Sequence, residues 1–326
     1  MKLLHRRQFL HLAAAAVVLP ATSRGARAQA YPSRPVRIVV GAPPGGGTDI
    51  TARLMGQWLS ERLGQQFIIE NRSGAGGNIA TEMAVRSPPD GYTLLMALHN
   101  NAINATLYEN LNFNFIRDIA PVAGLTRDPV VMEVRPSLPT KTVAEFIAYA
   151  KSSPGKINYA SGGNGSIQHV TGELFKMMTS VNMLHVPYRG EGAAFTDLLS
   201  GQVQVMFGTI TSSIGYIRAG TLRPLAVTTA IRLEALSDIP TVGDFVPGFE
   251  ASNLRGVAAP KNTPVEIIDK LNKEINAFLA DPKTKARFSD IGATVLPGSP
   301  ADFGQLIVDE TEKWAKVIKF AGIKAE

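Results

Sequence analysis

The sequence predicts an α/β fold divided into two domains. Short runs of apolar, β-branched residues, typical of buried strands, alternate with segments whose apolar residues recur at helical spacing. Loops rich in glycine join most of these strands to the helices that follow them. About 296 residues remain after an N-terminal export segment, which suits two domains of about 150 residues, each with its own hydrophobic core.

Residues 1–30 have the three parts of an export signal. They begin with three basic residues, Lys2, Arg6 and Arg7. The apolar run Leu10 to Leu19 is too short to span a bilayer, and Ala28-Gln29-Ala30 fits a small-x-small cleavage site. Arg6-Arg7-Gln8-Phe9-Leu10 resembles the twin-arginine signal, and an ordinary Sec signal with two arginines is the alternative. Either route predicts a periplasmic protein that is cleaved near Ala30.

The charge of the mature chain gives no reason to expect a nucleic-acid partner. Residues 1–30 hold five of the 33 basic residues and no acidic residue, so 28 basic and 27 acidic residues remain. The net charge of +6 therefore belongs mostly to the export signal and not to a binding surface. Cysteine is absent from the sequence, which excludes disulfides, thiolate nucleophiles and cysteine metal sites.

The stretch from residue 36 to residue 54 organises the first domain. Val36–Val40 predicts a buried strand, residues 43–47 form a Pro-Pro-Gly-Gly-Gly loop, and a helix follows with Thr48 or Asp49 as the expected N-cap. The apolar face of this helix is expected to comprise Ile50, Leu54, Met55, Trp58, Leu59 and Leu63. Because the first amides of a helix have no internal partner and glycines allow a ligand to come close, the stretch favours anion binding.

This loop does not match the two common phosphate-binding loops. No lysine follows Gly47, as a Walker loop requires, and Ile50 stands where the dinucleotide fingerprint requires glycine. The first cation along the helix is Arg53, so a carboxylate suits the loop better than a phosphate does. A plain strand-to-helix turn without a ligand is the alternative.

The same pattern repeats at Phe67–Ile69, where a strand precedes the glycine-rich loop 70–78 and another helix. Tyr92–Met96 predicts a further strand, and His99 follows it at the carboxyl edge of the sheet, where we expect a hydrogen-bonded cleft or loop residue. No metal site is expected. The other two histidines of the mature chain, His169 and His185, are not at ligand spacing.

A second unit of the same kind begins after the strand Val130–Val134. Thr142-Val143-Ala144-Glu145 is a capping box that opens a helix. Ile157–Ala160 predicts a strand, and residues 161–166 form a third glycine loop before the next helix. His169 lies one turn into that helix, where it either points at a ligand or covers the loop.

Two more strands of the second unit end in candidate cleft residues. After Leu184–Val186, Tyr188 either lines a pocket or joins the core. Arg189 is either a ligand contact or a solvated surface charge. The strand Val203–Phe207 leads through glycine to Thr209.

The last part of the chain is expected to return to the first unit. Arg255–Ala258 predicts a returning strand. Thr263-Pro264-Val265-Glu266 supplies an N-cap, a proline at the first helical position and a glutamate at the third, and Ser299-Pro300-Ala301-Asp302 opens the final helix in the same way. Two terminal helices need a sheet face to cover, which suggests that they pack on the first unit.

The sequence contains none of the catalytic signatures that we sought. It has neither G-x-S-x-G nor H-E-x-x-H. Four loops rich in Gly, Ser, Thr and Asn instead supply amide and hydroxyl donors with few charges, which favours holding a ligand over transforming one. We therefore predict a binding protein that has no cofactor and is not an enzyme. A hydrolase or isomerase with an acid–base pair assembled in space stays open as an alternative.

Six segments of the mature chain closely resemble the Bug family, the extracytoplasmic solute-binding proteins related to tripartite tricarboxylate transporters. They are RPVRIVVGAPPGGGTDITARL (34–54), ENRSGAGGNIA (70–80), PDGYTLLM (89–96), the NYASGGNGS…H…GELF run (158–175), HVPYRG (185–190) and LPGSPADF (296–303). The resemblance covers essentially all of residues 31–326. The chain departs from the usual family pattern at Asn100-Asn101, Ile167-Gln168 and Asn253-Leu254, and the first two of these bear on the identity of the ligand.

The resemblance implies a two-lobed type II periplasmic-binding-protein fold, a Venus flytrap with two crossing strands between the lobes. Lobe 1 would comprise residues 31–130 and 250–326, and lobe 2 residues 131–249. A monomeric protein would capture a small carboxylate (a dicarboxylate, an amino acid or an aromatic acid) between the lobes and deliver it to a tripartite tricarboxylate-type transporter. A ligand-sensing receptor that partners a sensor kinase would have the same cleft and is the alternative.

The residues expected to contact this carboxylate lie in the strand-end loops of both lobes. In lobe 1 they are Gly45, Gly46, Thr48, Asp49, Ser73, Ala75, Gly76 and His99. In lobe 2 they are Ser161, Gly163, Gly165, Ser166, His169, Tyr188, Arg189 and Thr209. Asp49 is the unusual member, because its carboxylate would repel an anionic ligand. It would cap the helix, hold a bridging water or accept a ligand ammonium.

Overall fold

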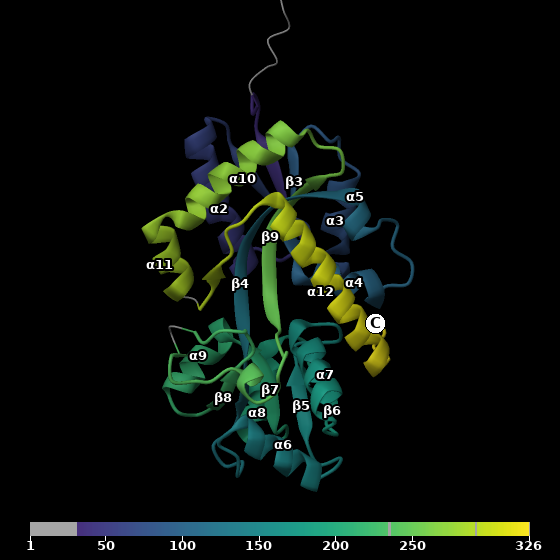
Figure 1. The fold of residues 1–326 in the computed structure, drawn as a ribbon, viewed down its shortest axis with the longest axis vertical. Coiled ribbons are helices and arrows are strands. Elements are labelled where there is room, and N and C mark those ends of the chain that lie inside the picture. The colour runs from purple at the N-terminus through teal and green to yellow at the C-terminus, as the bar shows by residue number, and fades with distance from the viewer. Residues whose placement is uncertain (1–30, 234–235, 291, 326) are drawn as a thin grey trace, which may run out of the picture.

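A computed structural model describes residues 31–233, 236–290 and 292–325 (Figure 1). It confirms an α/β fold of two lobes, which lie one above the other in Figure 1. Two strands connect them. Strand β4 (Ile119–Val134) runs from the first lobe into the second, and strand β9 (Ser252–Pro260) brings the chain back.

Lobe 1 is built on a sheet in which β2 (Phe67–Asn71), β1 (Val36–Val40) and β3 (Thr93–Leu98) are parallel, and β9 lies antiparallel between β3 and β4. Its first helices are α2 (Gly47–Leu63), α3 (Asn78–Val85), α4 (His99–Leu107) and α5 (Phe115–Asp118), with a 3₁₀ turn at Ala75–Gly77. After β9 come α10 (Val265–Ala280), α11 (Pro282–Asp290), β10 (Thr294–Val295) and α12 (Pro300–Ala321).

Lobe 2 continues from the second part of β4, which pairs antiparallel with β7 (Val205–Thr209) and β8 (Arg223–Val227). Strands β5 (Asn158–Ser161) and β6 (Leu184–Pro187) extend this sheet in parallel with β7. The helices of the lobe are α6 (Val143–Ser152), α7 (Ile167–Thr179), α8 (Glu191–Ser200) and α9 (Ile210–Arg218), with a 3₁₀ turn at Val242–Asp244.

The strand directions place the carboxyl ends of both half-sheets at the junction between the lobes. Strand β4 runs in the same direction as β1, β2 and β3, because β9 is antiparallel to both β3 and β4. In lobe 2, β7 is antiparallel to β4 and its last residue, Thr209, lies opposite Val130, so β5, β6 and β7 end at the junction. The strand-end loops of one lobe therefore approach those of the other, the position at which open α/β sheets bind ligands.

Helix α12 packs against both lobes, which corrects the expectation that both terminal helices cover the first unit. Its first half buries Phe303 and Ile307 against the lobe 1 sheet. Its second half buries Trp314 and Val317 in one cluster with lobe 2 residues and with α4. Figure 1 shows the helix running diagonally from the upper lobe toward α7 of the lower one. Helix α10 does pack in lobe 1, against α2 and β4.

Two predicted helix starts are wrong at the residue level. Helix α2 begins at Gly47 with Gly46 as its N-cap, so neither Thr48 nor Asp49 is the cap. Helix α10 has Pro264 as its N-cap, because the Thr263 hydroxyl turns back and donates to the Pro260 carbonyl at 2.7 Å. The predicted apolar face of α2 also includes one exposed residue, Ile50.

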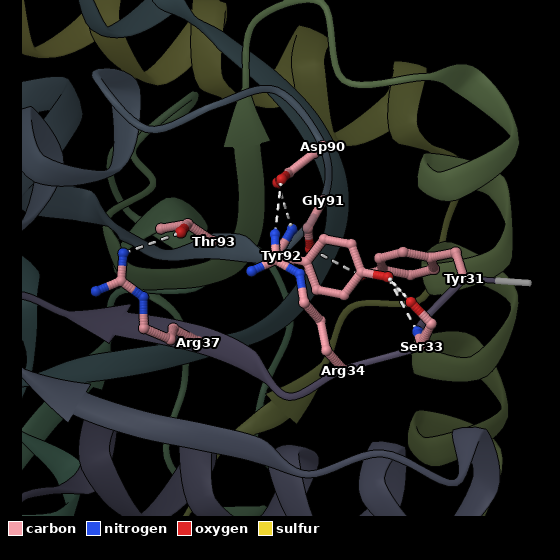
Figure 2. A network of polar contacts seen from close by, with 8 residues as sticks. All are labelled: Tyr31, Ser33, Arg34, Arg37, Asp90, Gly91, Tyr92 and Thr93. Carbon is pink, nitrogen blue, oxygen red and sulfur yellow. Dashed lines mark hydrogen bonds and ion pairs between the residues drawn. The ribbon is translucent and has the colours of Figure 1, made fainter. Parts of the chain in front are cut away.

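The first described residues are fixed to the turn before β3 (Figure 2). The Tyr31 hydroxyl donates to the Gly91 carbonyl at 2.8 Å, and the Ser33 amide donates to the Tyr92 hydroxyl at 2.9 Å. The Arg34 guanidinium lies over the Tyr92 ring, 4.1 Å from its centroid, and pairs with Asp90. The folded body of lobe 1 therefore includes the chain from Tyr31 onward. Among the described helices, none combines the length and the apolar composition needed to cross a membrane.

Candidate ligand-binding site

The N-terminus of α2 presents unpaired backbone amides at the junction. Gly46 has no side chain with which to cap the helix, and its extended backbone (φ −80°, ψ 168°) starts the first turn. Within the described ranges, the amides of Gly47, Thr48 and Asp49 donate to no protein acceptor. Three N–H groups at the positive end of a 17-residue helix are suited to a carboxylate oxygen.

The Asp49 side chain braces this loop, and its negative charge is paired with Arg53. One carboxylate oxygen accepts from the Gly45 amide at 2.9 Å and from the Arg53 guanidinium at 2.8 Å, and the other accepts from the Asn71 amide group at 2.9 Å. The Arg53 hydrogen bond is the main cause that lowers the pKa of Asp49 to about 2. Of the three roles expected for Asp49, helix capping comes nearest to what the structure shows. Asp49 is the third residue of α2 and not its N-cap, and its carboxylate holds the preceding loop against the helix through the Gly45 amide. The Gly45 amide already donates to Asp49 and is therefore not available to a ligand.

The second glycine loop of lobe 1 depends on glycine for its shape. Gly76 has a positive φ of 62°, and a Cβ there would lie 2.9 Å from the Asn104 amide nitrogen, which donates to the Gly76 carbonyl. Ala75 is itself in the left-handed region (φ 46°). Ser73, Ala75 and Gly76 are exposed. The buried side-chain nitrogen of Asn78, Nδ2, has no hydrogen-bond partner among the residues that the structure describes.

In lobe 2, the loop after β5 is organised around Ser161. Its hydroxyl lies 2.6 Å from His185 Nε2 and accepts from the Gly163 amide at 3.1 Å. The Ser166 hydroxyl donates to the Gly163 carbonyl at 2.7 Å and also accepts from the first turn of α7, which it caps. Ser161 is fully buried, and its hydroxyl is taken up by these contacts within lobe 2.

Gly165 is buried and its amide is occupied. It donates to His169 Nδ1 at 3.1 Å. A Cβ at this glycine would lie 2.4 Å from the Leu107 side chain of α4, so the residue marks a close contact between the two lobes. The prediction that Gly165 contributes an amide to the ligand is therefore not favoured by this geometry.

His169 covers the loop, the second of its two expected roles, and forms a stacked pair with His185. The two rings are 3.6 Å apart at their centroids and 10° from parallel. Burial lowers the pKa of His169 to about 4 and that of His185 to about 3, so both imidazoles are neutral at physiological pH. A neutral His169 can accept the Gly165 amide through Nδ1 only as the Nε2–H tautomer.

The remaining predicted residues of lobe 2 differ in their exposure. The Tyr188 hydroxyl donates to Asp197 at 2.6 Å, and the ring packs at the edge of a lobe 2 apolar cluster. Arg189 is exposed and forms no ion pair with any residue that the structure describes. Thr209 is half-buried at the end of β7, and both its amide and its hydroxyl donate to the Glu191 carboxylate, at 3.0 and 2.8 Å.

Sequence reasoning missed Arg255, which lies within the returning strand β9, beside the start of α2. It lies opposite Thr126 of β4, and its Nε donates to the Thr48 hydroxyl at 3.2 Å. Its Nη1 pairs with Asp128, and its Nη2 lies 3.4 Å from the position of a Cβ on Gly47. Burial lowers its pKa to about 10, so it is charged at neutral pH. Nothing in the local pattern distinguishes this arginine from one on a surface.

His99 is the nearby lobe 1 residue that sequence reasoning did identify. It is the first residue of α4 and is half-buried. Burial, and then the Arg255 charge, lower its pKa to about 3, so its imidazole is neutral at pH 7. In the described part of the chain, no group of three or more histidine, aspartate or glutamate side chains is arranged to hold a metal ion.

The family model of the "tripartite tricarboxylate transporter family receptor" matches residues 51–323. The chain belongs to this family. It is similar to the Bordetella pertussis protein BugT, with 35% identity over 300 residues that cover 91% of this chain and 92% of BugT. The resemblance to the Bug family is thereby confirmed. The members compared are solute-binding proteins and not enzymes.

Two solved structures of relatives were determined with carboxylates. The Rhodopseudomonas palustris protein Rpa4515, with adipate, is 39% identical, covers 90% of this chain and 99% of its own, and superposes with a TM-score of 0.77. The R. palustris protein MatC, with bound malate, is 32% identical, covers 88% and 100%, and has a TM-score of 0.73. These likenesses confirm the two-lobed periplasmic-binding fold.

Proposed function

We propose that the protein captures a small carboxylate between its lobes in the periplasm and delivers it to a tripartite tricarboxylate-type transporter. The observation that carries this proposal is the pairing of unoccupied amides at the start of α2 with the partly buried guanidinium of Arg255. A helix N-terminus and an arginine both favour a carboxylate oxygen. The adipate and malate in the two relatives support the same ligand class.

Both lobes are needed for useful affinity. A charged hydrogen bond contributes about 1.5–3 kcal/mol and a helix terminus up to about 2 kcal/mol, whereas micromolar binding requires about 8 kcal/mol after association costs. Lobe 1 would bind the carboxylate, and the exposed donors of lobe 2 would complete the site on closure. We place the lobe boundaries at residues 31–130 with 250–326 and at residues 131–249, near the strand pairings that change partner at Val130.

Export follows from the same proposal. The contacts of Tyr31 and Ser33 with the turn before β3 leave the fold complete if the chain is cleaved after Ala30. Replacing Arg6 and Arg7 by lysine should leave precursor in the cytoplasm if the signal is of the twin-arginine type. Unchanged delivery to the periplasm would indicate the Sec route.

Calorimetric titration with mono-, di- and tricarboxylates of two to six carbons tests the binding proposal. We expect saturable 1:1 binding of at least one of them, unaffected by EDTA because no metal takes part. Uptake of that acid should then require both this protein and the permease in intact cells. Binding without uptake would favour the sensor-kinase alternative, and no binding of any carboxylate would contradict the proposal.

A further inference from the structure

Glu191 places a negative charge at the lobe 2 edge of the site. It is the first residue of α8, two positions after Arg189, and is half-buried. Its carboxylate accepts hydrogen bonds from the Gln168 side chain and from the amide and hydroxyl of Thr209. Gln168 lies in the first turn of α7 and Thr209 at the end of β7, so all its partners belong to the edge that faces lobe 1.

These partners fill only some of the hydrogen-bond acceptor positions of the Glu191 carboxylate. A carboxylate has about four acceptor positions, and three are filled here, two on Oε1 and one on Oε2. All three donors are neutral. Among the described residues, no lysine, arginine or histidine forms an ion pair with Glu191, so one acceptor position and the full charge remain available to a partner.

The other carboxylates near the junction are already neutralised. Asp49 pairs with Arg53, and Asp128 pairs with Arg255. Glu133, which lies behind Glu191 in the core of lobe 2, is fully buried, and burial raises its pKa to about 8, so it is neutral at pH 7. Glu191 is therefore the carboxylate of this region whose charge no described side chain offsets.

We infer that the ligand carries an ammonium group that lies against Glu191 while its carboxylate lies against α2 and Arg255. This inference rests on the proposed function and narrows its substrate class to amino-carboxylates. A second ligand carboxylate in the same place would meet the Glu191 charge at short range, a penalty of roughly tenfold to a hundredfold in affinity. An ammonium would gain a charge-assisted hydrogen bond instead.

A purely structural role for Glu191 makes a different prediction. As a brace between α7, α8 and β7, the side chain needs to accept hydrogen bonds but does not need its charge. Glutamine keeps the size and one acceptor oxygen, so Glu191→Gln separates the two roles. Glu133→Gln is the matched control, because it alters a carboxyl group of the same lobe that is neutral and buried.

The test is calorimetric titration at pH 7 with two matched pairs of probes, adipate with 5-aminopentanoate and malate with aspartate, and with simple monocarboxylates. In the wild type we expect the ammonium-bearing member of at least one pair to bind more tightly by roughly tenfold or more. Glu191→Gln should abolish or reverse that preference, and Glu133→Gln should preserve it. Glu191→Ser, which keeps a small hydroxyl acceptor, should act in the same direction if the glutamine variant does not fold.

Two outcomes distinguish a failure of this inference from a failure of the proposed function. If carboxylates without an ammonium bind as tightly as their partners and the Glu191 variants leave the preference unchanged, the inference is overturned and the proposed function stands. If no carboxylate of the wider panel binds to the wild type, the proposed function fails and this inference fails with it.

Discussion

Replacing Gly47 by proline should weaken carboxylate binding without damaging the fold. Proline lacks an N–H and is well tolerated at the first helical position, which Gly47 occupies. The preceding Gly46 has φ −80° and ψ 168°, the extended conformation that favours a following proline. A Cβ on Gly47 would lie 3.4 Å from Arg255 Nη2, which is an ordinary contact. The substitution therefore removes one donor from the site.

The size of the effect follows from that single donor. A hydrogen bond to a charged group contributes about 1.5–3 kcal/mol, so the dissociation constant should rise by roughly tenfold to a hundredfold. Gly47→Ala is the control, because it adds the same Cβ and keeps the amide. We expect its affinity to stay within roughly threefold of the wild type.

The assay is calorimetric titration of both variants with the tightest-binding acid, together with thermal unfolding followed by circular dichroism. Both variants should unfold at or above the wild-type temperature, since proline and alanine each suit the first turn better than glycine does. If the two variants bind equally well, the α2 amides do not hold the carboxylate and our account of lobe 1 is wrong.

Four further predictions follow from the same geometry. Arg189→Ala should raise the dissociation constant less than Gly47→Pro does, because Arg189 is exposed and its contribution of up to about 1 kcal/mol is screened. Arg255→Ala should lower the free energy of unfolding by about 3–5 kcal/mol, because it leaves the buried carboxylate of Asp128 unpaired. Adding Asp128→Asn to that variant should restore its stability in urea titrations but should not restore its affinity for the ligand. The pKa of His169 is lower in the folded chain than in the unfolded one, so its contribution to stability is present above about pH 6.5 and is lost as the pH falls toward 4; His169→Asn, which keeps an acceptor for the Gly165 amide, should flatten this part of the pH–stability curve. Burial raises the pKa of Glu133 to about 8, so the stability contributed by its protonated form is fully present below about pH 4.5 and is lost as the pH rises through 8. Glu133→Gln should therefore make the protein more stable than the wild type at pH 9 in the same urea titrations.

Periodicity and capping signals predicted much of the fold because they act locally. The strand Val36–Val40 is confirmed residue for residue. The Thr142 hydroxyl accepts from the Glu145 amide, and Ser299 and Asp302 form the predicted capping box at the start of α12. Each of these features depends on residues within a few positions of one another, so a single sequence contains the whole signal.

The errors came from contacts between distant segments. Asp49 is the third residue of α2 and not its cap, and its oxygens accept from Gly45 in the preceding loop, from Arg53 one turn further along and from Asn71 at the end of β2. Thr209, which was expected to follow the strand Val203–Phe207, is the last residue of β7, and α9 follows it directly. The sequence likewise could not show that Gly165 would be closed off by Leu107 from the other lobe.

In the candidate site, too, local features were predicted from the sequence and contacts between distant residues were not. The strand-end loops were located from the sequence, because strands and glycine clusters are local patterns. Arg255 was missed, since its importance arises from Thr48 and Asp128, which are far from it in the chain and adjacent in the sheet. The significance of Glu191 depends in the same way on Thr209, 18 residues away.

Native mass spectrometry of the protein purified from the periplasm, followed by identification of the released small molecule, tests the central claim most directly. We predict one bound carboxylate per monomer, retained in the wild type and reduced or lost in Gly47→Pro. A protein that purifies without a bound acid and binds none on addition of the carboxylate panel, or one whose bound molecule has no carboxylate, would contradict the account.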